Sequence, residues 1–338
     1  MPTHIPNSRS ITDVRGVEVG HFTDTRRPTG CSVVITRSGA VGGVDVRGAA
    51  PGTRETDLLD PANLVNSVHA VMLSGGSAFG LDAASGVMRW LDERGIGLDV
   101  GTARVPIVPA AVLFDLHVGD ARIRPDAAGG YAACQAASTA APAQGNVGAG
   151  TGACVGKMFG MEFAMKGGIG SAAVSVDGVT VGALIAVNAL GDVLDTETGA
   201  LLAGARTADG NGLRNSHQSL LAGEPPLAIL AGTNTTIGVI ATDAALTKAQ
   251  AQRLAGAGHD GLARAIRPVH TLYDGDTLFA LGTGQVDRSP GLNVLAVMAA
   301  EAVSRACANA VRAAQTLRLP GLWLPSASEL AARLHSGL

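Results

Sequence analysis

Two apolar runs that enclose a short polar segment constrain the fold of this chain more than any other feature. Residues 226–243 have the sequence Pro-Leu-Ala-Ile-Leu-Ala-Gly-Thr-Asn-Thr-Thr-Ile-Gly-Val-Ile-Ala-Thr-Asp. Apolar runs of this length with β-branched members are typical of buried strands. The polar residues 232–236 between them are therefore expected at a strand end or a sharp bend, where the fold holds a hydroxyl group in place.

Asn234 and Thr235 within this polar segment suggest a self-cleavage reaction. In that reaction the Thr235 hydroxyl attacks the Asn234 carbonyl, the peptide bond rearranges to an ester, and water releases a new amino-terminal Thr235. A threonine hydroxyl is a weak nucleophile without an adjacent base. The new α-amino group titrates near neutral pH and would supply that base. A polar bulge between two strands, without any chemistry, is the alternative that these two residues leave open.

Several blocks of sequence, in order along the chain, carry a family resemblance. One is Asn-Thr-Thr-Ile-Gly-Val-Ile-Ala-Thr-Asp-Ala at 234–244. The others are Arg-Gly-Ala-Ala-Pro-Gly-Thr-Arg-Glu-Thr-Asp at 47–57, Ser-Gly-Gly-Ser-Ala-Phe-Gly-Leu-Asp-Ala at 74–83, Val-Pro-Ile-Val-Pro-Ala-Ala-Val-Leu-Phe-Asp at 105–115 and Asp-Gly-Asp-Thr-Leu-Phe-Ala at 274–280. Together they resemble the DmpA/P1 family (peptidase family S58) of self-processing aminopeptidases, which also contains β-peptidyl aminopeptidases and nylon-oligomer hydrolases. The resemblance covers nearly the whole chain.

This resemblance implies a fold and a set of active-site residues. The fold is α/β (α+β), a four-layer α-β-β-α sandwich of the DmpA type that resembles amino-terminal-nucleophile hydrolases, with Thr235 between the sheets. Lys157 would approach the nucleophile, the Asn188 amide would donate to the developing oxyanion, and Asp274 with Asp276 would orient Thr235 and its amine. Without the resemblance, a single lysine is usually solvated, a strand-end asparagine forms a turn and Asp-Gly is a common hairpin turn.

Phe114 marks a departure from the family pattern. Some relatives have a tyrosine there that is thought to help hold the oxyanion, and phenylalanine has no hydroxyl. Backbone N–H groups or another donor would have to take that role. We expect Phe114 and Thr236 in the vicinity of the substrate pocket. Ser77 is not expected to be a nucleophile, because Phe79 breaks the pattern Gly-x-Ser-x-Gly, and it is interpreted as a helix N-cap.

Composition limits the kind of protein. Hydrophobic residues make up 46% of the 338 residues and charged residues 16%, where a typical domain has about 25%. Low surface charge favours a homo-oligomer, and the resemblance implies a tetramer. A net charge of −3 argues against nucleic acid as a partner. The apolar runs are shorter than a membrane span, so no membrane insertion is expected, and the amino terminus lacks an apolar signal core, so a cytoplasmic protein is expected.

No cofactor or metal site is expected. The four cysteines are widely spaced, without a Cys-x-x-Cys pair, and are interpreted as buried free thiols. The eight histidines are scattered, without His-Glu-x-x-His. The glycine-rich segment 148–157 fits neither nucleotide-binding pattern, because Thr151, Ala153 and Met158 stand where such patterns need other residues.

The remaining pattern predicts one domain, 1–338, which self-cleavage would divide into 1–234 and 235–338. Short strands are expected within 11–46, a hairpin turns at 176–178, and a capping box starts a helix at 247. Segment 191–223 is expected to be an exposed, mobile loop, and Arg54 in the ordered loop 47–60 is expected to pair with Glu55 or Asp57. Helices are expected at 77–94, 126–140, 247–256, 261–266 and 293–315.

The leading interpretation is an aminopeptidase-like amide hydrolase with a threonine nucleophile. The resemblance implies small-molecule or short-peptide substrates: peptides, amino-acid amides or esters, β-peptides or nylon oligomers. An acyltransferase of the ornithine-acetyltransferase type would use the same chemistry, with an amine in place of water. A non-catalytic oligomeric binding protein that has kept the fold is the third interpretation.

Overall fold

One long strand connects the two halves of the central sheet. The computed structural model describes residues 9–227 and 233–336. In it, β2 (Thr29–Val46) has 18 residues. Its first part pairs with β1 (Glu18–Asp24) and β4 (Val68–Ser74), and its last part with β16 (Thr277–Val286). The register shifts between Ile35 and Ala40, next to Gly39, whose positive φ of 80° suits glycine. The strand therefore passes from one half of the sheet to the other at this irregularity.

Among the described residues, the sheet has nine strands in the order β10-β11-β14-β16-β2-β4-β7-β3, with β1 paired to β2. Strands β10 (Gly168–Val176) and β11 (Val179–Asn188) form the predicted hairpin. Strand β14 (Thr235–Ala244) lies antiparallel to β11 and parallel to β16. The short strands β7 (Ala110–Val112) and β3 (Thr53–Arg54) complete the other end. The predicted strand before Gly232 falls largely on residues 228–232, outside the described residues.

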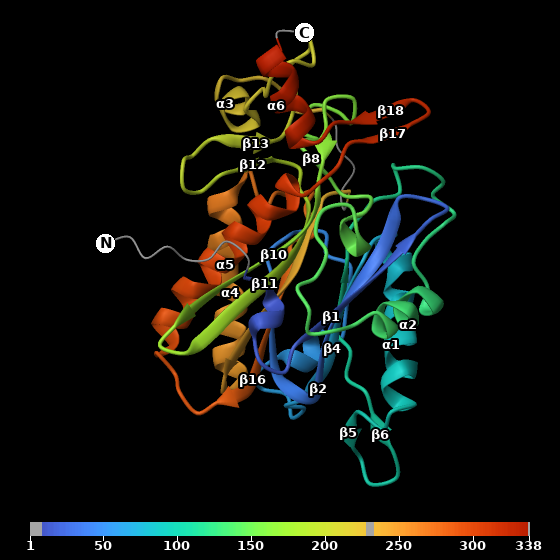
Figure 1. The fold of residues 1–338 in the computed structure, drawn as a ribbon, viewed down its shortest axis with the longest axis vertical. Coiled ribbons are helices and arrows are strands. Elements are labelled where there is room, and N and C mark those ends of the chain that lie inside the picture. The colour runs from blue at the N-terminus through green and yellow to red at the C-terminus, as the bar shows by residue number, and fades with distance from the viewer. Residues whose placement is uncertain (1–8, 228–232, 337–338) are drawn as a thin grey trace.

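Helices cover both outer faces of the folded sheet (Figure 1). Helices α1 (Ala83–Asp92) and α2 (Ala127–Gln135) pack on the half that contains β4, and α4 (Lys248–Ala265) and α5 (Leu292–Arg312) pack on the half that contains β11. Successive strand residues point to opposite faces. In β4, Ala70 and Met72 therefore join the α1/α2 core, while Val71 and Leu73 join the core between the sheet halves. The predicted four-layer α-β-β-α sandwich is confirmed.

The shorter elements surround these layers. They are η1 (Ile11–Asp13), η2 (Asp57–Leu59), β5 (Leu98–Asp99), β6 (Arg104–Val105), η4 (Gly148–Gly150), β8 (Cys154–Val155), β9 (Met165–Lys166), β15 (Ile266–Arg267), β17 (Leu317–Leu319), β18 (Leu322–Leu324) and α6 (Ala327–Ser336). The four cysteines are buried free thiols, as predicted.

Helix α4 begins as predicted but does not break. Thr247 and Gln250 form the capping box, and the helix then continues to Ala265 through glycines that were expected to end it. Gly258 and Gly261 allow close packing of α4 against its neighbours. A Cβ on Gly258 would lie 2.3 Å from Ile240 Cδ1, and one on Gly261 would lie 2.3 Å from the Ala300 carbonyl oxygen. Glycine lets α4 approach both the sheet and α5.

The predicted role of Ser77 as an N-cap is wrong. The 3₁₀ turn η3 (Ser77–Asp82) precedes α1 in place of a longer helix, and its N-cap is Gly76, in the left-handed region. Ser77 itself has a φ of 55° and donates its N–H to the Leu113 carbonyl. The residue thus ties the start of the turn to the segment after β7.

The predicted ion pair of Arg54 is also wrong. Its guanidinium contacts the Ser85 hydroxyl and the Met88 sulfur, at 3.4 and 2.8 Å. Glu55 accepts a hydrogen bond from the Val108 N–H at 3.1 Å. The two side chains leave β3 toward different neighbours, α1 and the segment before β7.

Segment 191–223, predicted to be an exposed loop, contains β12 (Asp192–Leu194), β13 (Leu201–Ala203) and α3 (Ser216–Leu221). The buried Asp192 carboxylate organises it by accepting hydrogen bonds from the Ala205 N–H and from the N–H and hydroxyl of Ser216, at 2.6 to 2.8 Å. The Asp192 carboxylate thus links distant parts of this segment. Hydrophobic periodicity carries no signal for such a link, so the segment was predicted to be a loop.

Helix α5 is long and apolar enough to cross a membrane by length and composition, with a mean hydropathy of 1.4 over its most apolar window. Of that window, 67% is buried inside the fold. Its small side chains pack against β10, β11 and α4, as expected for a core helix.

Candidate active site

Thr235 is the first residue of β14, and its side chain lies between the two halves of the sheet. Ile237 and Val239, which share its face of the strand, belong to the core between the halves. Its cross-strand partner is Asn188, the last residue of β11. Thr235 is 3% exposed. The expected location at a buried strand end is confirmed.

The predicted self-cleavage would attack the Asn234 carbonyl carbon, and the oxygen of this carbonyl accepts two hydrogen bonds. The Gly275 N–H donates to its oxygen at 2.9 Å, and the Thr235 hydroxyl donates to the same oxygen. The Gly275 N–H would therefore stabilise negative charge that develops on this oxygen. A Cβ on Gly275 would lie 2.6 Å from the Ala50 carbonyl oxygen and 3.0 Å from Thr235 Oγ1, so a side chain would crowd the nucleophile.

Lys157 holds the backbone that precedes the Asn234–Thr235 peptide bond. Its Nζ donates to the Asn188 carbonyl at 2.9 Å, to Asn188 Oδ1 at 3.0 Å and to the Thr233 carbonyl at 3.3 Å. Burial lowers the pKa of Lys157 to about 8, although Cys154 and the two aspartates work in the opposite direction. With acceptors for all of its protons, the side chain is placed as an ammonium ion.

The Asn188 side chain is held at both ends. Its Oδ1 also accepts from the Cys154 N–H at 3.0 Å, and its Nδ2 donates to the Phe114 carbonyl at 3.0 Å. The amide that the resemblance assigns to the oxyanion thus has one N–H engaged by Phe114. Donation of its other N–H to an oxyanion stays a prediction.

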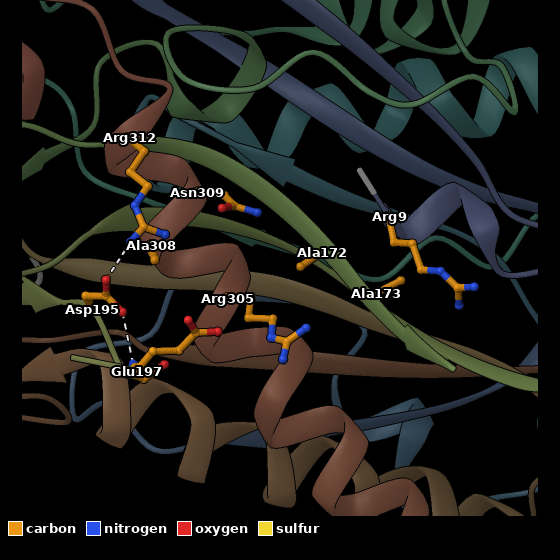
Figure 2. A pocket seen from close by; sticks show the side chains of 10 residues that line it. Arg9, Ala172, Ala173, Asp195, Glu197, Arg305, Ala308, Asn309 and Arg312 are labelled. Atoms are coloured by element: carbon orange, nitrogen blue, oxygen red, sulfur yellow. Dashed lines mark hydrogen bonds and ion pairs between the residues drawn. The ribbon is translucent and has the colours of Figure 1, made fainter. Parts of the chain in front are cut away.

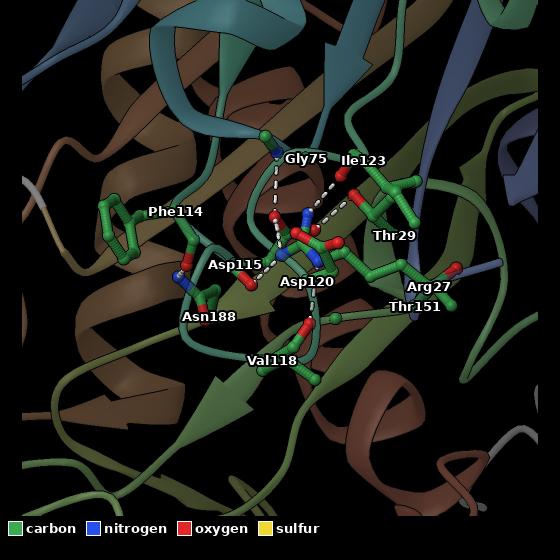
Figure 3. A network of polar contacts seen from close by, with 12 residues as sticks. Arg27, Thr29, Gly75, Phe114, Asp115, Val118, Asp120, Ile123, Thr151 and Asn188 are labelled. Carbon is green, nitrogen blue, oxygen red and sulfur yellow. Dashed lines mark hydrogen bonds and ion pairs between the residues drawn. The ribbon is translucent and has the colours of Figure 1, made fainter. Parts of the chain in front are cut away.

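A buried ion pair fixes the segment that carries the Phe114 carbonyl (Figure 3). Arg27 and Asp115 are paired at 2.8 Å with fully buried side chains. Asp115 accepts further hydrogen bonds from the Thr29 hydroxyl at 2.6 Å and the Gly76 N–H at 2.9 Å. Because a buried charge is costly unless it is fully bonded, this network resists displacement. It anchors Phe114 and, through it, Asn188.

Asp274 and Asp276 flank Gly275, and both are 1% exposed. Asp274 accepts from the Thr271 N–H and hydroxyl at 2.8 and 2.6 Å. Burial, together with the charge of Asp276, raises the pKa of Asp274 to about 6.

Asp276 is bonded to the strand that carries the nucleophile. Its Oδ1 accepts from the Thr236 N–H at 2.6 Å, and its Oδ2 contacts His270. Asp276 is thus bonded to the residue that follows Thr235, whereas the side-chain hydrogen bonds of Asp274 go to Thr271. Direct orientation of Thr235 or its amine by Asp274 and Asp276 stays a prediction.

Block 47–57, one of the segments that carry the family resemblance, supports the backbone of the Asp274–Asp276 turn. Arg47 and Gly48 donate their N–H groups to the Asp276 carbonyl, and Ala50 donates to the Asp274 carbonyl, at 2.9 to 3.2 Å. A Cβ on Gly48 would lie 2.2 Å from the Asp276 nitrogen. The loop therefore holds the backbone of the turn at residues 274–276 through these hydrogen bonds.

Sequence reasoning missed His270, Thr271 and the Gly275 N–H. The only signal for Gly275 was a glycine between two acidic residues, which a simple turn also explains. Thr236, predicted near the pocket, is fully buried, and its Oγ1 has no hydrogen-bond partner among the described residues. Phe114 is half-buried, and its ring contacts the His117 ring at a centroid distance of 4.7 Å.

A cavity elsewhere contains none of the predicted site residues. It has a volume of about 390 Å³ and is lined by residues of α5 and β10 together with Arg9, Asp195 and Glu197, with Arg312 paired to Asp195 at 2.7 Å (Figure 2). Within residues 9–227 and 233–336, no group of three or more His, Cys, Asp or Glu side chains is arranged to hold a metal ion.

The four-layer sandwich, with a buried threonine at the start of a central strand, has the architecture that the sequence predicted. The chain belongs to peptidase family S58, whose model matches residues 9–321. It is accordingly a hydrolase of peptide or amide bonds.

Two relatives of the chain each match most of its length. An uncharacterized aminopeptidase of Mycobacterium leprae is 49% identical over 309 residues, which are 86% of this chain and 83% of that protein. A 6-aminohexanoate-oligomer endohydrolase of Kocuria sp. is 33% identical over 279 residues, 81% of this chain and 75% of that protein.

Solved structures share the fold. The L-aminopeptidase D-Ala-esterase/amidase from Ochrobactrum anthropi has a TM-score of 0.70 at 22% identity and covers 98% of this chain, with 94% of its own chain covered. A β-aminopeptidase of Burkholderia sp. has a TM-score of 0.69 at 24% identity, with 97% and 94% of the two chains covered. At these identities the likeness concerns the fold alone.

Proposed function

We propose that this protein is a self-processing aminopeptidase whose nucleophile is Thr235, released as an amino-terminal residue by cleavage after Asn234. The observation that carries the proposal is the arrangement at the Asn234 carbonyl. The Gly275 N–H and the Thr235 hydroxyl both donate to its oxygen, so the nucleophile lies beside an already polarised carbonyl.

Self-cleavage begins when Thr235 Oγ1 bonds to the Asn234 carbonyl carbon. The carbonyl oxygen takes negative charge, which the Gly275 N–H stabilises. The hydroxyl proton passes to the Thr235 nitrogen as this intermediate collapses. The C–N bond breaks, the Asn234 acyl group remains as an ester on Oγ1, and Thr235 gains a free α-amino group. Water then attacks the ester, and Asn234 becomes the carboxyl terminus of the first fragment. Lys157, bonded to the Thr233 carbonyl, holds the departing segment in line.

Substrate hydrolysis repeats this chemistry at a second carbonyl. The α-amino group of Thr235 accepts the hydroxyl proton as Oγ1 bonds to the substrate carbonyl carbon. The oxyanion takes the place of the Asn234 oxygen against the Gly275 N–H, with Asn188 as the second donor. The proton passes to the leaving amine, which departs, and water hydrolyses the acyl-enzyme to the acid.

The substrates that we propose are short peptides, amino-acid amides or esters, or related oligoamides. Support comes from the names of the relatives, which include an aminopeptidase and a 6-aminohexanoate-oligomer endohydrolase. Phe114 supplies an apolar ring in place of a phenol near the site. A panel of amino-acid p-nitroanilides, β-amino-acid amides and 6-aminohexanoate oligomers, assayed for released amine, ranks these classes.

The intact mass of the denatured protein tests the nucleophile. We expect fragments 1–234 and 235–338 from the wild-type chain, a single full-length chain from Thr235→Ala, and slow but detectable cleavage from Thr235→Ser, which keeps a hydroxyl. Full-length wild-type chain after prolonged incubation would contradict the proposal. Ornithine added with an acyl donor distinguishes the acyltransferase alternative, which predicts transfer above hydrolysis.

We further propose a homotetramer located in the cytoplasm. Only the low content of charged residues, 16%, supports self-association directly. Light scattering coupled to size-exclusion chromatography measures the mass, and an observed monomer would contradict the tetramer.

A further inference from the structure

His270 lies beside the nucleophile strand and has no place in the mechanism described so far. Its Nδ1 is 2.8 Å from Asp276 Oδ2, and its backbone N–H donates to the same oxygen at 3.1 Å. The other oxygen of that carboxylate accepts from the Thr236 N–H at 2.6 Å. Asp276 therefore bridges His270 and the residue that directly follows Thr235.

The hydrogen bonds determine the state of the imidazole. A carboxylate oxygen can only accept, so Nδ1 carries a proton and donates it. The His270 Nε2 is buried and has no hydrogen-bond partner in the described part of the chain. The ring meets that of His259 edge to face, with centroids 4.8 Å apart, and His259 is in turn 3.0 Å from the Asp45 carbonyl through its Nε2. The His270 ring is thus held between α4 and the Asp276 carboxylate.

The backbone of His270 is also unusual. Its φ of 55° lies in the left-handed region, which is uncommon for residues other than glycine, although asparagine, aspartate and histidine adopt it more often than the rest. Strained residues of this kind persist where their surroundings hold them in place. Here the two hydrogen bonds to Asp276 hold both the backbone and the side chain of His270.

We propose that His270 is a positioning residue for the reaction of Thr235, acting through Asp276. By fixing the carboxylate, it fixes the Thr236 N–H and with it the Cα of the nucleophile. This role grows after cleavage, because Thr235 then loses its covalent link to Asn234. The Asp276 hydrogen bond is then a side-chain tether one residue from the new terminus. The inference rests on the proposed function of Thr235.

Two substitutions separate the donated hydrogen bond from the volume of the side chain. His270→Asn places an N–H donor close to the position of Nδ1, and asparagine tolerates the left-handed backbone. His270→Gln extends its donor past that position. The matched control is His69→Gln, which removes another largely buried imidazole, on β4, away from the nucleophile.

The experiment measures kcat and KM of the processed enzymes on an amino-acid p-nitroanilide. We expect His270→Gln to lower kcat about 10- to 100-fold, since a misplacement of the order of 1 Å costs that much, with KM within about threefold of wild type. His270→Asn should recover kcat to within about threefold of wild type, and His69→Gln should leave it unchanged. Equal kcat for His270→Gln and wild type, or equal losses for His270→Gln and His270→Asn, would overturn the inference while the proposed function stands.

A second measurement does not depend on activity. In the uncleaved Thr235→Ala background, hydrogen exchange of peptides that cover residues 235–244 reports the Thr236 amide. We expect faster exchange at the start of β14 in His270→Gln than in His270→Asn, with the end of the strand unchanged. If the wild-type chain neither cleaves nor hydrolyses, the proposed function fails, and equal exchange in the two variants would show that the positioning role fails as well.

Discussion

Lys157 and Lys166 both bury an ammonium group among oxygen acceptors, and in both burial lowers the pKa to about 8. The acceptors of Lys166 are backbone carbonyls of the glycine-rich loop and of its own neighbour: Gly150, Ala153 and Gly167. Lys157 instead donates to Asn188 and to the Thr233 carbonyl. Lys166 binds a loop, whereas Lys157 connects the end of β11 to the residue before Asn234, in the segment that the proposed cleavage would release.

This difference shows that burial and a lowered pKa do not by themselves identify a functional lysine. The two residues share both properties, and only their partners differ. A carbonyl that must move or change charge during a reaction marks the functional case, and a carbonyl in a fixed loop marks the structural one. Variants of the two lysines therefore test whether this criterion holds.

The largest effect is expected for Lys157→Met. Loss of the ammonium removes a charged donor that holds the Thr233 and Asn188 carbonyls. A resulting shift of the order of 1 Å at the reacting carbonyl costs about 100-fold, so we expect cleavage to slow by at least that factor. Timed intact-mass measurements give the rate. Cleavage at the wild-type rate would place Lys157 with Lys166 among structural residues.

The second-largest expected effect is that of pH on the cleavage rate. Above a pKa of about 8 Lys157 loses its charge and one donor, so we expect the cleavage rate to fall about tenfold per pH unit between pH 8 and 10. A rate that rises through pH 8 would contradict this expectation and identify the neutral amine as a general base. Lys166→Met should keep the wild-type profile.

Stability should respond to the same titration with the opposite sign. The folded-state pKa of each lysine lies below the unfolded value of 10.5, so the unfolded chain binds more protons between pH 8 and 10.5. The free energy of unfolding therefore rises over this window. Chemical denaturation of uncleaved Thr235→Ala at several pH values measures the slope, which Lys166→Met should reduce. An unchanged slope would mean that Lys166 does not titrate there.

Asn188→Ala should slow cleavage by about tenfold, less than loss of Lys157, because Lys157 keeps the backbone carbonyls as acceptors. The double variant with Lys157→Met tests the link between the two residues. If Asn188 acts by holding Lys157, the double variant should cleave no more slowly than Lys157→Met alone. Additive losses would show that the Asn188 amide acts separately, for example as an oxyanion donor.

The smallest effect on cleavage is expected for Lys166→Met, within about threefold of wild type. The hydrogen bonds of Lys166 go to the Gly150, Ala153 and Gly167 carbonyls, and none of them goes to Asn234 or Thr235. Three buried hydrogen bonds from a charged donor are lost, and we expect a loss of about 2 to 4 kcal/mol in the free energy of unfolding. Urea denaturation in the Thr235→Ala background measures it. A large loss of cleavage at full stability would contradict the structural role.

Much of the architecture could be predicted because it depends on local pattern. The hairpin of β10 and β11, the capping box of α4 and the helix α5 each have a signal within a few residues. The polar end of β14 was likewise visible as a break in an apolar run. Such features need no knowledge of what lies opposite them.

Other features depend on contacts between distant segments. The pairing of Arg27 with Asp115 and the ordering of segment 191–223 by Asp192 have no periodic signature. The glycines of α4 were expected to end the helix, because their purpose, contact with Ile240 and Ala300, lies on other elements. His270 was missed for the same reason, since its significance comes from Asp276 and Thr236 together.

The order of strands in the central sheet determines when the chain can be cleaved and how a cleaved molecule can refold. Strands β14 and β16, which both belong to residues 235–338, lie between β11 and β2, which both belong to residues 1–234. Cleavage after Asn234 would thus leave the second fragment inserted as the middle of a sheet whose two sides belong to the first. Folding has to come before cleavage, and a processed molecule that later unfolds must find its other fragment by diffusion. Its recovery would depend on protein concentration, as for a dimer encoded by one gene.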